Sequence, residues 1–108
     1  MTQLYEVVSG LILLHKREIF YRLHGEVLLP LMKQVGIVPV LMIITEVGRY
    51  NTFLDVYRYR DFADYQQKTD ALLSSPGMEP YYKNIGDCIH GGIEVQLMRD
   101  LPYAMDHV

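Results

Sequence analysis

Asp55 is the residue whose type and position point most directly to chemistry. It lies between Leu54 and Val56 in a stretch typical of a β-strand, where aspartate is disfavoured. Strand alternation places it on the same face as Tyr57, and if Leu54 and Val56 face the helices, Asp55 faces the interior. Burial disfavours the charged form of a carboxylate, so Asp55 is a candidate proton donor or acceptor. A carboxylate at a solvent-filled rim, or one paired with an arginine of a second subunit, accounts for the position equally well.

Two further residues are candidates to assist Asp55 in proton transfer. Glu6 shares a strand face with Val8, and if that face lines the same cavity the two carboxylates can approach each other. A structural salt bridge, or hydrogen bonds to a turn, is the alternative. His24 lies one turn after Phe20 at the edge of the apolar sector of a predicted helix and is suited to shuttle protons. A hydrogen-bonded packing role is its default interpretation.

Aromatic side chains are expected to form the walls of a ligand site. The chain has nine tyrosines, three phenylalanines and no tryptophan. Tyrosine combines an apolar ring with a hydroxyl group that can orient a ligand. Most of these tyrosines are more simply core or interface residues, so only a minority is expected to touch a ligand. The residues predicted to contact it are Tyr57, Tyr59, Phe53, Met42 and Tyr81.

Composition and motifs exclude several classes of function. Cys88 and His90 have no second ligand pair at metal-binding spacing, and no nucleotide-binding fingerprint is present, so we expect no metal and no cofactor. The net charge is −3 without a basic block, which argues against nucleic acid as a partner. The apolar run over residues 7–14 is too short to span a membrane. A single cysteine fits a reducing compartment, so we expect a cytoplasmic protein.

Hydrophobic periodicity predicts the elements that must position these residues. Strands are expected at residues 4–13, 38–46, 52–59 and 93–98, and helices at 16–36, 62–73 and 78–86. Gly10 suggests a bulge or a close backbone approach, and Pro30 should kink or divide the first helix. Asp61 is a plausible N-cap, and Gly91-Gly92 are expected to introduce the last strand.

The predicted order is β-α-β-β-α-β in a single domain over residues 1–108. This order is typical of an α+β, ferredoxin-like antiparallel sheet with the helices on one face. Leu41 and Ile43 point to one side of their strand, and Met42 and Ile44 point to the other. Both faces are therefore apolar, and a C2 homodimer is the economical way to cover the face without helices.

The sequence resembles the NIPSNAP-domain family at several positions. Glu46-Val47-Gly48 followed by Asn51 resembles the E-[IV]-G-x-x-N turn of that family, and Tyr57-Arg58-Tyr59 takes the place of its W-x-Y. Tyr5-Glu6 resembles the opening Y-E of its first strand. Val8 stands where the family usually has arginine, and Gly10 stands where it has tyrosine, so the chain resembles a divergent member.

The resemblance implies a ferredoxin-like chain that pairs into a dimeric α+β barrel. Relatives with this barrel include monooxygenases, isomerases, cyclases and dehydratases, so the fold does not name the function. One hypothesis is a protein that binds a small apolar or aromatic metabolite in the barrel cavity, as a cofactor-independent enzyme with Asp55 as its acid or base. The other is a non-enzymatic homodimeric binding or interaction module. An open pocket containing Asp55 favours the first, and a filled interior favours the second.

Overall fold

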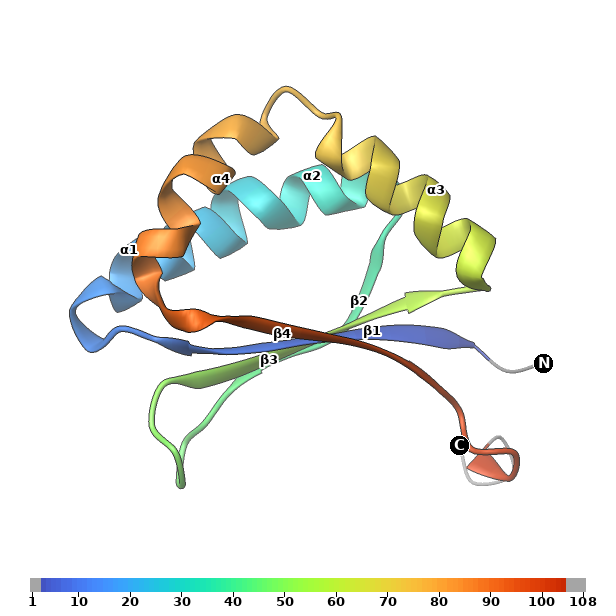
Figure 1. Ribbon diagram of the computed structural model, residues 1–108, viewed down its shortest axis with the longest axis horizontal. Coiled ribbons are helices and arrows are strands. Elements are labelled where there is room, and N and C mark those ends of the chain that lie inside the picture. The colour runs from blue at the N-terminus through green and yellow to red at the C-terminus, as the bar shows by residue number, and fades with distance from the viewer. Residues whose placement is uncertain (1–2, 105–108) are drawn as a thin grey trace.

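The computed structural model describes residues 3–104 as one four-stranded sheet covered by helices (Figure 1). The strands are β1 (Leu4–Ile12), β2 (Val38–Ile44), β3 (Thr52–Tyr59) and β4 (Ile89–Arg99). The α-helices are α1 (Arg17–Arg22), α2 (Leu29–Gln34), α3 (Phe62–Leu73) and α4 (Met78–Ile85), with shorter helical segments η1 (Leu14–Lys16), η2 (Leu23–Leu28) and η3 (Gly86–Cys88). Among these residues no helix has both the length and the hydrophobicity to span a bilayer.

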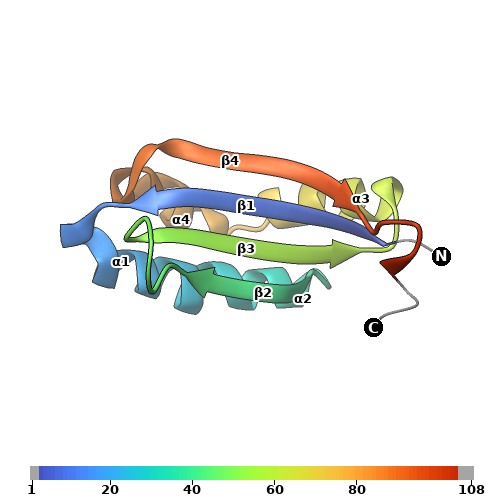
Figure 2. The same cartoon turned by 90° about the horizontal axis from the view of Figure 1, so that it is seen from below.

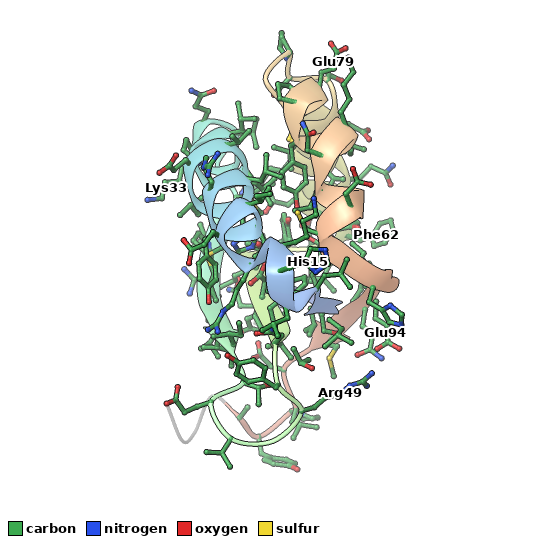
Figure 3. The ribbon with its side chains drawn as sticks, turned by 90° about the vertical axis from the view of Figure 1, so that its left-hand side faces the viewer. His15, Lys33, Arg49, Phe62, Glu79 and Glu94 are labelled. Atoms are coloured by element: carbon green, nitrogen blue, oxygen red, sulfur yellow. The ribbon has the colours of Figure 1, made fainter. Side chains whose placement is uncertain are left out.

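The strand order is β2-β3-β1-β4, and all neighbouring strands are antiparallel. The helices lie on one face of the sheet, and the view from below shows the strands of the other face without helical cover (Figure 2). This arrangement confirms the predicted α+β, ferredoxin-like fold. In Figure 3 Lys33 and Glu79 point away from the interior, as expected for the polar sides of amphipathic helices.

The strand register decides which side chains face the helices. Val8 lies opposite Asp55 and Glu6 lies opposite Tyr57, and these residues share the helix-facing side of the sheet. Leu54 and Val56 point to the other side, so the premise that they face the helices is wrong. Asp55 therefore faces a space between the sheet and the helices of its own chain. Alternation alone could not distinguish the two faces, because both are apolar.

Gly10 is both a point of close approach and part of a bulge, as the sequence predicts. A Cβ atom at Gly10 would lie 2.9 Å from Cε1 of Phe53. The β1–β4 register shifts between Gly10 and Leu11, where Gly91 and Gly92 have positive φ angles of 74° and 82°. The prediction that Gly91-Gly92 introduce the last strand is wrong, because this pair forms a bulge inside β4, which already begins at Ile89.

The first helical region is continuous but changes its hydrogen-bond pattern before Pro30. η2 is a π-helical segment between α1 and α2, and the N–H group of Leu29 donates to the carbonyl oxygen of His24, five residues earlier. Pro30 has no N–H group, so it cannot continue an α-helical ladder at that position. Beside Pro30 the helical region therefore changes type without a break, and the wider turn that precedes Pro30 carries His24.

The hairpin turn and the start of α3 also follow local chemistry. β2 ends at Ile44 rather than at the predicted residue 46, and beyond it the N–H group of Thr45 donates a hydrogen bond to the carbonyl oxygen of Thr52. Asn51 has a positive φ of 65°. Asp61 is the predicted N-cap of α3, and its carboxylate accepts a 2.8 Å hydrogen bond from the N–H group of Asp64.

The buried side chains between helices and sheet form two clusters. One cluster includes Leu4, Met32, Tyr57 and Met78, and the other consists of Ile12, Phe20, Phe53 and Cys88. The polar group of Asp55 is buried among these apolar side chains. Such a group is costly unless it has hydrogen-bond partners, so its contacts identify the candidate site.

Candidate functional site

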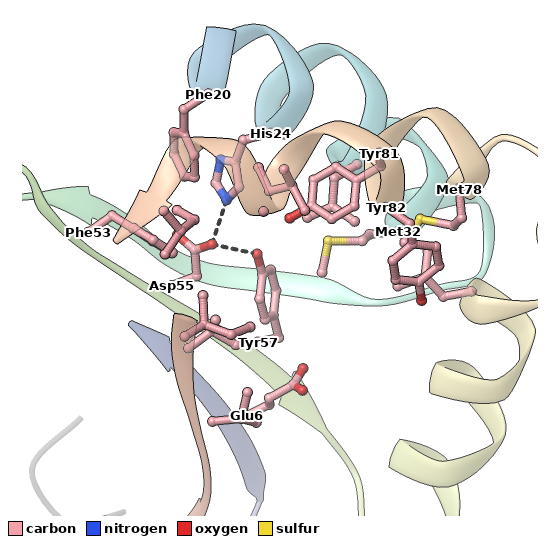
Figure 4. Close-up of a pocket in the computed structure, with 18 of the residues that line it drawn as sticks. Glu6, Phe20, His24, Met32, Phe53, Asp55, Tyr57, Met78, Tyr81 and Tyr82 are labelled. Carbon is pink, nitrogen blue, oxygen red and sulfur yellow. Dashed lines mark hydrogen bonds and ion pairs between the residues drawn. The ribbon is translucent and has the colours of Figure 1, made fainter. Parts of the chain in front are cut away.

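Asp55 is held by two side chains in the interior of the protein (Figure 4). Its Oδ2 atom accepts a 2.9 Å hydrogen bond from the hydroxyl of Tyr57 and lies 2.5 Å from Nε2 of His24. Asp55 is 3% exposed and Tyr57 is 2% exposed. Asp55 and Tyr57 come from β3 and His24 comes from η2, so the site joins the sheet to the helical layer.

The π-helical turn and its aromatic neighbours fix the ring of His24. Phe20 stacks on the imidazole with a centroid separation of 4.9 Å and an interplanar angle of 18°. Phe53 meets the same ring edge-on at 6.1 Å. π-helical turns recur at functional sites because they displace side chains from the ordinary helical path. With the imidazole packed in this way, Nε2 is directed at Asp55.

The roles of the two ring nitrogens of His24 follow from its tautomer, and a hydrogen bond donated to Asp55 requires the hydrogen on Nε2. To donate to the carboxylate, Nε2 must carry a hydrogen in both the neutral and the charged imidazole. Neutral His24 therefore presents Nδ1 as its basic atom, and within residues 3–104 neither Nδ1 nor the Oδ1 atom of Asp55 has a hydrogen-bond partner. The pair thus retains two acceptor atoms that can take part in proton transfer.

Glu6 occupies another part of the same space. Its carboxylate accepts hydrogen bonds of 3.3 Å from the hydroxyl of Tyr59 and 3.4 Å from that of Tyr65. Burial raises the pKa of Glu6, and these two hydrogen bonds oppose the rise. Glu6 does not bond to Asp55, and Tyr57 stands between the two carboxylates (Figure 4).

The tyrosines beside Asp55 are hydrogen-bond donors and not bases. Burial is the main cause that raises the pKa of Tyr57 above its usual range, followed by the charge and the hydrogen bond of Asp55. Burial, and then the charge of Asp55, likewise raises the pKa of Tyr81. Both hydroxyls therefore stay protonated at neutral pH and can stabilise negative charge on a neighbouring oxygen.

A cavity of about 390 Å³ opens onto this network. It lies between helices and sheet, and most of the atoms that line it are apolar. Helical side chains that line it include Phe20, Leu28, Met32, Leu72, Met78, Tyr81, Tyr82 and Ile85, and strand residues include Glu6, Val8, Phe53, Asp55, Tyr57, Ile89, Ile93 and Val95. In the part of the chain that the structure describes, no lysine or arginine lines it.

Comparison with known proteins gives the chain a family. The NIPSNAP family model matches residues 11–104. The chain belongs to the NIPSNAP family. No curated protein matches its sequence. The low identities to the solved structures below agree with the divergence indicated by Val8 and Gly10.

Solved structures support the fold of this NIPSNAP chain. A NIPSNAP family protein of unknown function from Agrobacterium tumefaciens is 16% identical over 91% of this chain and 87% of its own, with a TM-score of 0.79. A second NIPSNAP family protein from that organism is 13% identical over 94% of this chain and 95% of its own, with a TM-score of 0.82. A putative antibiotic biosynthesis monooxygenase from Nitrosomonas europaea is 10% identical over 93% and 91% of the two chains, with a TM-score of 0.71.

Most of the residues predicted to form a site line one cavity of the NIPSNAP chain. The location of this cavity differs from the barrel cavity that the sequence led us to expect. Glu6, His24, Phe53, Asp55, Tyr57 and Tyr81 all line the cavity. This cavity lies between the sheet and the helices of the chain itself, and not on the sheet face without helices. Tyr59 is 1% exposed and does not line it, because its hydroxyl is directed at Glu6. Met42 lies outside it, in a smaller hollow on the β2 side.

Several cavity residues of the NIPSNAP chain were not predicted. Met32 and Met78 come from helices whose apolar spacing was visible in the sequence. That spacing marks an inward-facing side chain without showing whether it fills a core or borders a void. Within the described residues no group of three metal-ligating side chains is present, and no metal site is assigned.

Proposed function

We propose that this NIPSNAP domain binds a small, largely apolar or aromatic molecule with a hydroxyl group, and moves a proton at that group. The observation that carries the proposal is the state of Asp55 in an apolar cavity. His24 and Tyr57 both hold its Oδ2 atom, and Oδ1 has no partner within residues 3–104. A carboxylate oxygen without a partner, on a residue that lines the cavity, is a ready acceptor for a ligand hydroxyl.

The size and charge of the cavity support this ligand class. A volume of about 390 Å³ falls within the range of about 300–1,000 Å³ that is usual for small-molecule sites. Glu6 and Asp55 line the cavity, and none of the described lysines and arginines does. The two carboxylates would therefore repel an anionic ligand, with no positively charged side chain to offset the repulsion. A neutral molecule of one or two aromatic rings matches both features.

The proposed chemistry is general acid–base catalysis. Asp55 accepts a proton from the ligand. His24 holds the carboxylate in place through its contact with Oδ2. The hydroxyl of Tyr57 stabilises the charged form of the carboxylate through its 2.9 Å hydrogen bond. Proton removal is a step shared by isomerase, cyclase and cofactor-independent monooxygenase reactions. The likeness in fold to a putative antibiotic biosynthesis monooxygenase is consistent with such a role and does not select among these reactions.

The experiment is a titration of [methyl-13C]methionine protein by NMR with three matched compounds: 2-naphthol, 2-methoxynaphthalene and 2-naphthoate. Met32 and Met78 line the cavity, whereas Met98 lies half-exposed on β4 and serves as the internal control. We expect 2-naphthol to shift Met32 and Met78 but not Met98. One hydrogen bond to a charged group corresponds to about tenfold in affinity. 2-Methoxynaphthalene cannot donate this hydrogen bond, so it should bind more weakly than 2-naphthol by that factor.

The variant Asp55→Asn tests the role of the carboxylate in the same titration. This variant should weaken the binding of 2-naphthol and leave the binding of 2-methoxynaphthalene unchanged. Only 2-naphthol has a hydroxyl group that can donate a hydrogen bond to Asp55. 2-Naphthoate should bind most weakly to both proteins. Equal binding of all three compounds, or shifts that are largest at Met98, would contradict the proposal.

A homodimeric interaction module is the second candidate function, and the outer face of the sheet favours it. Val38, Leu41 and Ile43 lie on this face and are 41–50% exposed. We propose that a second copy covers them, which light scattering would report as a mass near twice 12.6 kDa. Ile43→Lys should give the monomer, whereas Val47→Lys in the exposed turn should not. A wild-type mass of one chain would refute the dimer.

We propose a cytoplasmic location for this domain. The support is the single cysteine, Cys88, which is free and buried and has no described partner for a disulfide. Cell fractionation with compartment markers tests the location. Recovery with an extracytoplasmic marker would contradict it.

A further inference from the structure

The smaller hollow on the β2 side is a second chamber, and it reaches His24 and Asp55 from the opposite edge of the sheet. It has a volume of about 260 Å³ and lies between the first helical region and β2, where Tyr21, Gly25, Met42 and Ile44 line it. Phe20, His24, Phe53 and Asp55 line both this chamber and the main cavity. These four side chains therefore form a partition between two spaces.

The strand order separates the two spaces. The main cavity extends to Ile93 and Val95 of β4, and the second chamber extends to Met42 and Ile44 of β2. In the order β2-β3-β1-β4 these strands are the two edges of the sheet (Figure 2). Asp55 projects from β3, between the edges. A ligand that fills the β4 side therefore leaves the β2 side of the pair uncovered.

We infer that the β2-side chamber is a solvent port, a water-binding site through which His24 and Asp55 exchange protons while the main cavity is occupied. Its volume is enough for several waters, each of which takes about 30 Å³ in the liquid. Tyr21 at its wall is 41% exposed, and Gly25 is also exposed, so the chamber meets solvent at the helix surface. The phenolic hydroxyl of Tyr21 accepts a 2.8 Å hydrogen bond from Nε of Arg17, and its own O–H group is a donor for water at this opening.

The port gives the pair a complete proton path. A proton that leaves a ligand oxygen passes to the pair and from the pair to water in the port, and water returns a proton by the same route. Only O–H and N–H bonds form and break, no electrons are transferred, and water is the only co-reactant. Access of water to His24 is a property of the free protein, so its test does not depend on the proposed ligand.

Two glycines allow each space to be narrowed separately. Gly25 lines the second chamber only, and Gly86 lines the main cavity only. At both positions an added Cβ atom meets nothing within 4 Å, and neither glycine has a positive φ angle. Gly25→Leu and Gly86→Leu are therefore matched variants, with the same side chain added on opposite sides of the partition. Neither glycine belongs to the proposed acid–base machinery.

The readout is hydrogen–deuterium exchange at C2 of the histidine rings, measured by mass spectrometry on the full chain in D2O. This exchange requires solvent to reach the ring. The side chain of His24 is 13% exposed, and the exposed His15 and His90 provide internal controls in the same sample. Gly25→Leu should slow exchange at His24 by about threefold or more, as narrowed solvent access predicts, and leave both controls unchanged.

Gly86→Leu should leave exchange at His24 close to that of the wild type. The inference is overturned if Gly25→Leu has no effect on His24, or if Gly86→Leu slows it as much. Circular dichroism verifies that each variant is folded. Should leucine disturb the helix, Gly25→Met places an unbranched side chain in the chamber and must give the same slowing. Because no ligand is added, failure here leaves the ligand-binding proposal standing, and failure of the titration above leaves the port standing.

Discussion

Replacing Tyr57 with phenylalanine removes one hydroxyl from the interior and leaves the rest of the ring in place. That hydroxyl donates a 2.9 Å hydrogen bond to Asp55, and Tyr57 is 2% exposed. A hydrogen bond to a charged group contributes about 1.5–3 kcal/mol, so we expect Tyr57→Phe to lower the free energy of unfolding by about 2 kcal/mol. For a chain of this size that change corresponds to a fall in Tm of about 8 °C.

Tyr59→Phe is the matched control, because it removes the same group from the same strand. The hydroxyl of Tyr59 donates to Glu6 over 3.3 Å, a longer and weaker contact. We therefore expect a loss of about 1 kcal/mol for Tyr59→Phe, half that of Tyr57→Phe. Urea unfolding followed by circular dichroism, at one protein concentration for all variants, measures both values.

A double-mutant cycle isolates the Tyr57–Asp55 contact. In an Asp55→Leu background the hydroxyl of Tyr57 has already lost its acceptor. Tyr57→Phe should therefore leave the free energy of unfolding of that variant almost unchanged. The coupling energy should be about 1–2 kcal/mol, whereas Tyr57→Phe and the remote change Asp61→Ala should be additive within about 0.5 kcal/mol. The reasoning is refuted if Tyr57→Phe costs no more than Tyr59→Phe, or if the coupling with Asp55 is no larger than that with Asp61.

Three further changes test other parts of the structure. Because burial raises the pKa of Glu6, its contribution to stability is complete below its ordinary pKa of 4.5 and is lost as pH rises through the raised value. Glu6→Gln should remove this loss in urea unfolding at a series of pH values. A backbone hydrogen bond is the main cause that lowers the pKa of Asp64, so its contribution is present above 3.8 and is lost as pH falls through the lowered value; Asp64→Asn should flatten acid unfolding in that range. Gly10→Ala places a Cβ atom 2.9 Å from the ring of Phe53 and should cost about 1–3 kcal/mol in thermal unfolding, and an unchanged Tm would contradict that close contact.

The order of the elements and the identity of the central carboxylate could be predicted from sequence, because both depend on local patterns. Asp55 stands out as an acidic residue in an apolar strand, and Asp61 precedes a helical pattern as its N-cap. The side of the sheet that Asp55 faces could not be predicted, because Leu54 and Val56 on one side of the strand and Phe53 and Tyr57 on the other give both sides apolar or aromatic side chains. Only the packed helices distinguish the two faces.

Other details of the site depend on contacts between distant segments. Glu6 was expected to approach Asp55, but the register of β1 and β3 pairs it with Tyr57 and directs it to Tyr59 and Tyr65. The π-helical turn that carries His24 requires a five-residue hydrogen bond, which no sequence period marks. The sequence therefore supplied the residues of the network without their pairing.

The most direct measurement of the central claim is proton abstraction at the Asp55–His24 pair. 2-Tetralone is a neutral bicyclic ketone whose enol carries the hydroxyl group of the proposed ligand class. Removal of a proton from its acidic C–H group gives that enol, and NMR in D2O follows the removal as exchange of the hydrogen for deuterium. A positioned general base contributes about 10²–10⁴ in rate, so the wild-type protein should accelerate exchange well above buffer. Asp55→Asn should abolish the acceleration, and His24→Gln should reduce it, whereas Gly86→Ala should retain most of it. Exchange at the buffer rate with the wild type, or an equal rate with Asp55→Asn, would contradict the account.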